Sequence, residues 1–265
     1  MADNEHRPVT LTDDMRTKFN AVSTATLAGQ MQRRGSRNSF LGGLKPLREG
    51  QRMLGYAHTL RYVPKNEEFE RRSKGPNAQR RAVESIEPDD VLICEAGFQP
   101  HAGTIGDIFT MVIKQRGGAG FITDGALRDT PAVAEIGIPI YHQSSHAATL
   151  GRLHTPLDHQ IPIACAGVTV FPGDILVGDG EGVCVIPSRW AEEIANDSYA
   201  QELEEEWAIE RVAARLRAED RTLEIGCGDG DAARALHARG FRVECADRTA
   251  LHGGLERFRS PQAST

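Results

Sequence analysis

The sequence predicts an α/β domain whose sheet is mixed rather than purely parallel. Between Asp90 and Tyr141, short apolar runs alternate with helix-like segments, which is the pattern of parallel strands joined by helices. From Ile163 to Ile186, apolar runs follow one another too closely for helices to fit between them. Turn-forming sequences such as Pro172-Gly173-Asp174 separate these late runs, so this part of the sheet is expected to be antiparallel.

The first elements can be assigned in order along the N-terminal part of the chain. Apolar residues recur at helical intervals from about Leu11 to Arg34, which predicts one helical segment. Met53–Val63 is expected to be a strand and Asn77–Ser85 a helix. The segment between them, Pro64–Lys74, is highly charged and is expected to form a loop or an exposed arm.

The remaining elements follow from apolar runs bounded by turn-forming or acidic residues. The expected strands are Asp90–Cys94, Gly120–Thr123, Ile138–Tyr141, Ile163–Val170, Asp174–Val177 and Gly182–Ile186. The expected helices are Gly106–Arg116, Thr130–Ile136 and Arg189–Arg217.

Composition limits the classes of protein to which the chain belongs. Its 37 acidic and 31 basic residues give a net charge of −6, which argues against a nucleic-acid partner, because such proteins usually carry a basic face. No apolar stretch reaches the roughly 18 residues of a membrane span, and no signal-peptide core is present. The five cysteines have no CxxC spacing, so a cytoplasmic protein is expected. One basic run is interpreted as a solvated face or loop: Arg71, Arg72, Lys74, Arg80 and Arg81.

The most informative motif comes directly after the strand predicted at Gly120–Thr123. Arg128 and Asp129 stand where α/β proteins usually place loops that contact ligands. A metal site for a 2-oxo acid needs a carboxylate to hold a hard cation and a guanidinium to hold the substrate's oxygens. The adjacent pair offers both.

A second motif opens the helix predicted from Gly106. The first amides of a helix are free donors for an anion, and Asp107 stands where it could reach a cation directly or through water. A structural interpretation is also open at this point. In that interpretation Asp107 and Asp124 are cap or turn residues, and Arg128 and Asp129 form a surface ion pair.

Residues from about Met15 to Val212 resemble the family of 4-hydroxy-4-methyl-2-oxoglutarate aldolases, which also contains the regulator of ribonuclease activity A. The family pattern of an Asp, twenty residues and then Arg-Asp is met by Asp107, Arg128 and Asp129. Four longer stretches also carry the resemblance: Ser23–Leu27, Gly75–Gln79, Gly120–Asp129 and Pro172–Val183.

The resemblance implies a fold, an assembly and an activity. The fold would be a compact α-β-β-α sandwich with a mixed sheet over residues 1–217, assembled as a homotrimer or homohexamer with sites between subunits. The activity would be that of a lyase, a class II aldolase and oxaloacetate decarboxylase acting through a pyruvate enolate. Its cofactor would be Mg²⁺ or Mn²⁺, and its substrate a small 2-oxo acid, with sugar-acid-derived 2-oxo acids among the candidates.

The same resemblance assigns roles to individual residues. Asp129 is expected to ligate the metal, and Asp107 to hold a metal-bound water. Arg128 is expected to hold the enolate oxygen. The backbone amides that receive the substrate's carboxylate are expected in the helix-opening segment Gly106, Asp107, Ile108 and Phe109.

Aldol cleavage also needs a base, whereas decarboxylation of oxaloacetate does not. The resemblance places the base on a neighbouring subunit's C-terminal helix, and Glu204 is the favoured residue in this region. The alternative function is a non-catalytic regulator that binds and inhibits an RNA-processing enzyme. Asp107 favours the enzyme, since the regulator branch typically has no carboxylate at that position.

Several residues depart from the family pattern or stay unassigned. Ala132 stands where the family often has an acidic residue, and the nearest acid, Glu135, comes three residues later. The substrate is therefore allowed to differ from that of the named aldolase. The central histidines lack metal-ligand spacing and are not assigned to the site; they include His101, His142 and His146.

The C-terminal segment, residues 218–265, resembles the first β-α-β unit of an S-adenosylmethionine-dependent methyltransferase. A strand runs into the glycine-rich turn Gly226–Gly230, and a helix and a second strand ending at Asp247 are expected to follow. Such a fold needs several more strands, and the chain ends 18 residues after Asp247. A truncated fragment is therefore favoured over a working methyltransferase.

Overall fold

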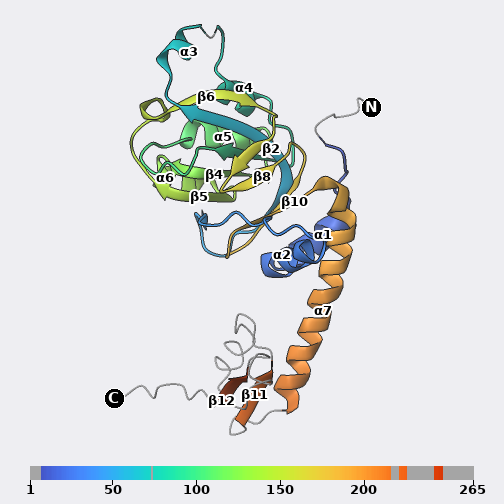
Figure 1. Cartoon of the computed structure of the whole chain (residues 1–265). Coiled ribbons are helices and arrows are strands. Elements are labelled where there is room, and N and C mark those ends of the chain that lie inside the picture. The colour runs from blue at the N-terminus through green and yellow to red at the C-terminus, as the bar shows by residue number, and fades with distance from the viewer. Residues whose placement is uncertain (1–6, 73, 216–220, 226–241, 247–265) are drawn as a thin grey trace, which may run out of the picture. The chain divides into compact units, whose positions relative to one another are not determined.

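An eight-stranded mixed sheet forms the centre of the first of two units, Met1–Gln201 and Glu202–Thr265, into which the chain divides. The structure, a computed structural model shown in Figure 1, describes residues 7–72, 74–215, 221–225 and 242–246. The strands of the main sheet are β1 Lys45–Pro46, β2 Met53–Pro64, β3 Asp90–Glu95, β4 Gly120–Leu127, β5 Ile140–Ser145, β6 His154–His159, β9 Ile175–Gly178 and β10 Val183–Ile186. A separate hairpin consists of β7 Ile163–Cys165 and β8 Val168–Val170.

The described residues also form seven α-helices and two short 3₁₀ turns. The α-helices are α1 Asp13–Ala21, α2 Thr24–Arg33, α3 Glu67–Arg72, α4 Ala78–Glu84, α5 Asp107–Gln115, α6 Thr130–Ile136 and α7 Ala191–Arg215. The 3₁₀ turns are η1 Leu150–Arg152 and η2 Ser188–Trp190.

The sheet combines a parallel centre with antiparallel edges. Its order is β1-β5-β4-β3-β2-β9-β10, and β6 pairs with the C-terminal half of β2. Strands β2 to β5 are mutually parallel, whereas β1, β6, β9 and β10 run antiparallel to their neighbours. The predicted mixed sheet is confirmed. The carboxyl ends of β3, β4 and β5 lie at one edge, which is where α/β proteins usually bind ligands.

Strand β2 pairs with different strands along its length. Met53–Tyr56 pair with β9, while Leu60–Pro64 pair with β6, with an irregularity in register between Arg61 and Tyr62. The middle of the strand, Tyr56–Arg61, pairs with β3. Changing partners along one strand lets the sheet curl while its backbone groups stay hydrogen-bonded.

Alternating side chains of β3 build cores on the two faces of the sheet. Leu92 and Cys94 pack in the cluster that contains side chains of α4, α5 and α6. Val91 and Ile93 pack in the cluster that contains the β7–β8 hairpin. All four are fully buried, and burying a side chain such as Leu or Ile contributes about 1.5–3 kcal/mol.

A third core joins the two ends of the first unit. Phe19 of α1, Leu27 of α2 and Ile194 of α7 pack against the outer faces of β9 and β10. The N-terminus of α2 is held by Asp179, whose carboxylate accepts from the Thr24 amide and the Thr24 hydroxyl, both at 2.8 Å. Two of the stretches that carry the family resemblance therefore meet here for a structural reason.

Some predicted segments differ from the structure in their boundaries, and the exposed arm contains a helix that was not expected. The helix expected over Leu11–Arg34 is two helices, because Ser23 leaves the helical conformation and its side chain caps α2. Part of the charged arm at Pro64–Lys74 forms α3, and no residue of α3 is buried. The strand expected over Ile163–Val170 turns back on itself at Ala166-Gly167, where both residues have positive φ.

The second unit contains a two-stranded parallel sheet. β11 Arg221–Ile225 pairs with β12 Arg242–Ala246, from Arg221 opposite Arg242 to Ile225 opposite Ala246. This is the pairing expected of the outer strands of a β-α-β unit. The glycine-rich turn, the helix and Asp247 of that prediction lie outside the described residues.

The buried carboxylate of Asp174 gives a testable dependence of stability on pH. Burial raises the pKa of Asp174 to about 6, although the amides of Phe171 and Ser188 donate to it. The folded protein therefore binds this proton more tightly than the unfolded chain does, and stability falls as the pH rises from about 4 to about 6. Between pH 4.5 and 7.5 the loss from this group is about 2 kcal/mol.

We predict that Asp174→Asn reduces the difference between the unfolding free energies at pH 4.5 and 7.5 by about that amount. Urea titrations of wild type and variant at both pH values measure it. Asp14→Asn, at an exposed carboxylate of α1, should leave the difference unchanged. An Asp174 variant with the wild-type pH dependence would contradict the prediction.

Candidate active site

Arg128 and Asp129 lie at the carboxyl end of β4, which is longer than predicted. The strand continues through Asp124 and Gly125 to Leu127, and all of its residues are buried. Asp129 then adopts a left-handed conformation (φ 54°, ψ 36°) and begins α6 without capping it through its side chain. The chain thus turns sharply at Asp129 and leaves its carboxylate available for another partner.

Two glycines let a neighbouring loop approach this pair closely. A β-carbon built on Gly103 would lie 2.6 Å from Arg128 Cβ, and one built on Gly106 would lie 2.5 Å from Asp129 Oδ2. Gly106 has φ −121°, so glycine is needed there for space rather than for conformation. The Arg128 amide also donates to the Ile105 carbonyl at 2.9 Å, which fixes the loop against β4.

The same loop presents the N-terminus of α5 to the Asp129 carboxylate. Gly106 is the N-cap, and the first intrahelical bond is made by the Thr110 amide to the Gly106 carbonyl at 3.1 Å. The amides of Asp107, Ile108 and Phe109 therefore precede the helical hydrogen-bond ladder. Helix dipole and free amides favour an anion at this position.

Asp107 occupies one of these amides itself. Its Oδ1 accepts from the Ile108 amide at 2.8 Å. The prediction that Ile108 receives a substrate carboxylate therefore requires Asp107 to rotate away from that amide. Ile108 is strongly exposed, whereas Phe109 is partly buried and packs against the core beneath α5.

The donor set is compatible with a weakly held hard cation. Asp107 is the first residue of α5, and the Asp129 carboxylate lies against Gly106, the residue before it. The Asp129 carboxylate also contacts Arg128 Nε at 3.5 Å. Among the described residues, no group of three or more His, Cys, Asp or Glu side chains is close enough to form a metal cluster. Mg²⁺ is commonly held by one or two carboxylates, with water and substrate completing its shell, so two carboxylates fit such an ion.

Asp124 is a structural residue rather than a ligand. It is 1% exposed, and its carboxylate accepts from the amides of Ala96 and Ala166. Burial raises its pKa in spite of these hydrogen bonds. Asp124 is thus structural but is not the cap or turn residue that was expected, because it lies within β4 and its side chain ties the loop after β3 and the β7–β8 turn to that strand.

One supporting residue was not assigned from the sequence. Gln79 of α4 is buried, and its side-chain amide donates to the Thr104 carbonyl at 2.6 Å and to the Tyr62 hydroxyl at 3.0 Å. Thr104 lies between the two glycines, and its amide donates to Ala126 of β4. The Gly75–Gln79 stretch thus supports the loop that faces Arg128 and Asp129.

A family model described as RraA-like, Aldolase/RraA, matches residues 24–185, which is more than half of the chain. The chain belongs to the RraA-like family. The structure of RraAS2 from Streptomyces coelicolor, described as an unusual member of the RNase ES inhibitor RraA protein family, is 32% identical. It superposes with a TM-score of 0.69 and covers 76% of this chain and 97% of that chain. The mixed α/β fold is therefore that of RraA-like proteins.

Other relatives are named as aldolases. A protein of Halalkalibacterium halodurans, provisionally named 4-hydroxy-4-methyl-2-oxoglutarate aldolase, is 27% identical over 199 residues, or 73% of this chain and 86% of that protein. One of Deinococcus radiodurans with the same provisional name is 28% identical over 135 residues, or 51% of this chain and 78% of that protein. The RraA-like relatives thus include both aldolase and inhibitor names.

The remaining predictions for this RraA-like chain concern Glu204, the basic run and the absence of a membrane span. Glu204 is exposed on α7, in the second unit, and its role stays a prediction. Four arginines of the basic run pair with acidic side chains, which supports the interpretation as a solvated face: Arg71 and Arg72 with Glu68, Arg80 with Glu84, and Arg81 with Asp158. Within the described ranges, no helix has the length and apolar character needed to cross a bilayer.

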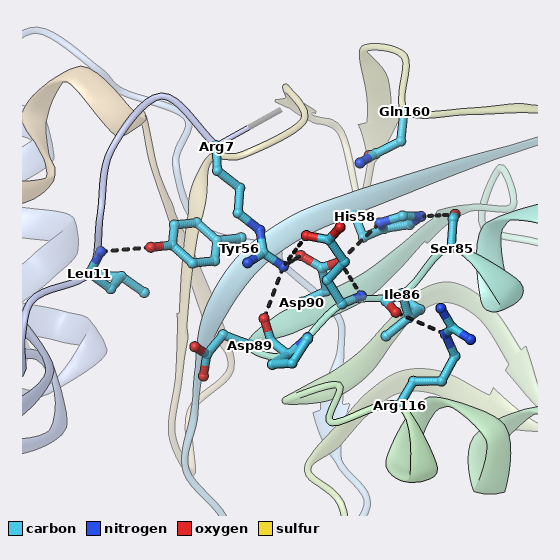
Figure 2. Close-up of polar contacts among 12 residues, drawn as sticks. Arg7, Leu11, Tyr56, His58, Ser85, Ile86, Asp89, Asp90, Arg116 and Gln160 are labelled. Carbon is cyan, nitrogen blue, oxygen red and sulfur yellow. Dashed lines mark hydrogen bonds and ion pairs between the residues drawn. The ribbon is translucent and has the colours of Figure 1, made fainter. Parts of the chain in front are cut away.

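Figure 2 shows a second polar cluster, around Asp90 at the start of β3. His58 Nδ1 lies 3.2 Å from Asp90 Oδ2, and Ser85 Oγ lies 3.2 Å from His58 Nε2, which is the order of a Ser-His-Asp triad. However, Arg7 donates to the other oxygen of Asp90 at 2.7 Å. Burial raises the pKa of Asp90, but hydrogen bonds from His58, the Glu87 amide and Arg7 outweigh it and hold the pKa below its ordinary value.

The serine of this cluster serves a structural purpose. Ser85 follows α4, and its hydroxyl donates to the Ala82 carbonyl at 3.1 Å, as a capping side chain does. Arg7 also donates to the Pro88 carbonyl and lies over the Tyr56 ring. The cluster therefore fastens the N-terminal segment to the sheet and is not assigned a catalytic role.

The close approach at Gly106 can be tested without removing any ligand. In Gly106→Ala the new methyl group would displace the Asp129 carboxylate, so we expect affinity for Mn²⁺ to fall by about tenfold or more, as when an outer-shell partner is lost. Isothermal titration calorimetry measures the affinity, and circular dichroism checks the fold.

Gly29→Ala on α2 is the matched control, because nothing lies within 4 Å of a β-carbon there. It should bind Mn²⁺ as the wild type does. Equal affinities of the two variants would show that the position of Asp129 against Gly106 is irrelevant to cation binding.

Proposed function

We propose that this RraA-like protein is a divalent-metal-dependent lyase that cleaves or decarboxylates small 2-oxo acids through a pyruvate enolate. One observation carries the proposal. The Asp129 carboxylate lies against Gly106, the N-cap of α5, and contacts Arg128 Nε at 3.5 Å, so a carboxylate and a guanidinium lie next to the helix start that carries Asp107. The aldolase names of two relatives support the same reading.

Asp129 would bind the cation, Mg²⁺ or Mn²⁺, directly, and Asp107 would hold water in its shell. A bound divalent cation supplies Lewis-acid stabilisation of negative charge on the substrate's oxygens. Arg128 would give up its contact with Asp129 in order to hold the substrate. That contact is 3.5 Å long and half-exposed, so it costs little to break.

The chain's own groups then handle the two ends of the 2-oxo acid. The amides of Ile108 and Phe109 would receive its carboxylate once Asp107 has turned away from the Ile108 amide. Arg128 would hold the oxygen on C2. When the C3–C4 bond breaks, its electron pair moves into the C2–C3 bond and charge develops on that oxygen, where a fixed guanidinium stabilises it. Protonation at C3 completes pyruvate.

The fate of the other fragment distinguishes the two reactions. Oxaloacetate loses CO₂ directly, so no base is required. A 4-hydroxy-2-oxo acid must first lose its hydroxyl proton, and Glu204 from a neighbouring subunit of a homotrimer or homohexamer would take it. Oxaloacetate decarboxylation is therefore the activity to test first.

The second candidate function is a non-catalytic regulator that binds and inhibits an RNA-processing enzyme. The likeness to RraAS2, described as a member of an RNase inhibitor family, favours it. This reading predicts that an endoribonuclease co-purifies with the chain and that Asp129→Ala retains it. Under the lyase proposal no such partner is needed.

We expect metal-dependent pyruvate release from oxaloacetate to fall by about 100-fold or more in Asp129→Ala and to vanish when a chelator is added. Glu135→Gln, at an exposed carboxylate of α6, should keep wild-type activity. A coupled lactate dehydrogenase assay measures the pyruvate. Equal turnover by wild type and Asp129→Ala would remove the lyase proposal. A wild type that releases no pyruvate would also remove it.

Arg128→Lys tests the role of the guanidinium separately from that of the cation. Lysine keeps the charge but loses the planar pair of donors, so we expect kcat to fall by about 100-fold while Mn²⁺ affinity stays within about twofold. Steady-state kinetics and calorimetry on the same preparation measure the two quantities. A variant with normal kcat would show that Arg128 does not hold the developing charge.

A further inference from the structure

The loop before α5 departs from a regular strand pairing at Thr104. Gly103 forms a parallel bridge with Ala126 of β4, and the Thr104 amide donates to the Ala126 carbonyl at 2.8 Å. In a regular parallel ladder the next bond would run from the Arg128 amide to the Thr104 carbonyl. The Arg128 amide instead donates to the Ile105 carbonyl at 2.9 Å. The pairing therefore slips by one residue, as it does at a β-bulge.

Gln79 binds the carbonyl that this slip leaves without a strand partner. Thr104 is 1% exposed, so its carbonyl needs a hydrogen-bond donor from within the protein. The side-chain amide of Gln79 donates one hydrogen to this carbonyl at 2.6 Å and the other to the Tyr62 hydroxyl at 3.0 Å. Gln79 is itself 6% exposed on α4, so its amide is fixed through both hydrogens.

Without Gln79, the Arg128 amide is the donor that a regular ladder would offer to the Thr104 carbonyl. Accepting from it would shift the loop by one residue, about 3.3 Å, along β4. Gly106 would then no longer face Asp129, whose Oδ2 lies 2.5 Å from a β-carbon built on Gly106 in the observed register. The two registers thus differ in whether the start of α5 meets Asp129.

We propose that Gln79 is a positioning residue that holds the loop in the slipped register and so places the start of α5 against Asp129. The inference rests on the lyase proposal for the use that the protein makes of this site. It assigns to α4 a part in cation binding that is exerted through the Thr104 carbonyl and not by contact with a ligand.

Gln79→Leu tests the inference, because leucine has a similar volume but donates no hydrogen bond. We expect the affinity for Mn²⁺, measured by isothermal titration calorimetry, to fall by about tenfold or more, as when an outer-shell partner is lost. Crystal structures of wild type and variant should show that the Arg128 amide has moved from the Ile105 carbonyl to the Thr104 carbonyl.

Gln51→Leu is the matched control. Gln51 is 7% exposed, and its side-chain amide also donates to a backbone carbonyl at 2.6 Å, that of Ile140 at the start of β5. Both variants leave a buried carbonyl without its donor, so they should lose stability to a similar extent. The Mn²⁺ affinity of Gln51→Leu should stay within about twofold of the wild type, because β5 begins at the sheet edge opposite to the candidate site.

Gln79→Glu separates the hydrogen bond from the shape of the side chain. An ionised carboxylate only accepts hydrogen bonds, whereas a protonated carboxyl group can donate to the Thr104 carbonyl. Burial raises the pKa of a carboxyl group, which brings its protonation into the range that can be tested. The Mn²⁺ affinity of this variant relative to the wild type should therefore rise as the pH falls from about 8 to about 5.5. For Gln79→Leu the same ratio should not change with pH.

The outcomes separate this inference from the lyase proposal. Equal Mn²⁺ affinities of Gln79→Leu and Gln51→Leu would overturn the inference, and so would a Gln79→Glu ratio that does not depend on pH. Undiminished turnover of oxaloacetate by Gln79→Leu would overturn the inference alone. A wild type that releases no pyruvate, but whose Mn²⁺ affinity depends on Gln79 as described, would support the inference while removing the lyase proposal. A wild type that binds no Mn²⁺ would overturn both.

Discussion

The candidate site depends on the contact between the Gly103–Gly106 loop and the end of β4. Neither segment has a regular conformation of its own at this point, because a left-handed residue, Asp129, follows β4 by two positions and the loop lies just before α5. Each is held by the other, through the Arg128 amide and through the space that the missing side chain of Gly106 leaves for Asp129. Everything that the site requires, a carboxylate, a guanidinium and free amides, is assembled by this one close approach.

Buried polar residues extend that contact into the rest of the unit. Asp124 and Gln79 both hydrogen-bond to backbone groups of loops next to β4. A buried carboxylate or amide is expensive unless it is hydrogen-bonded, so each of them strongly favours a single arrangement of the loops that it holds. The loops that form the candidate site are thus positioned by the buried side chains of Asp124 and Gln79.

Much of the fold could be predicted because its strands are buried on both faces. The central strands read as continuous apolar runs, and Arg128 and Asp129 follow one of them directly. Strand β6 could not be predicted in this way, since His154–His159 is polar and contains a proline, as an edge strand can. The break between α1 and α2 was hidden because the apolar residues on both sides of Ser23 fall into one helical period.

The site itself could be predicted only in part. Residue types and order indicated Arg128, Asp129 and the start of α5. The spacing did not indicate that Gly103 and Arg128, which are 25 positions apart in the sequence, lie in contact.

The anchoring of α2 by Asp179 has a consequence for how the chain is made. The two partners are separated by 155 residues, and the apolar faces of α1 and α2 pack on β9 and β10, which are also late in the chain. At about 5–20 residues per second, a ribosome needs on the order of 8 to 30 seconds to deliver Asp179 after Thr24. Throughout that interval Phe19 and Leu27 lack the part of their core that β9 and β10 supply, namely Ile175, Val177, Cys184 and Ile186, so the N-terminal helices reach their final packing only late in synthesis.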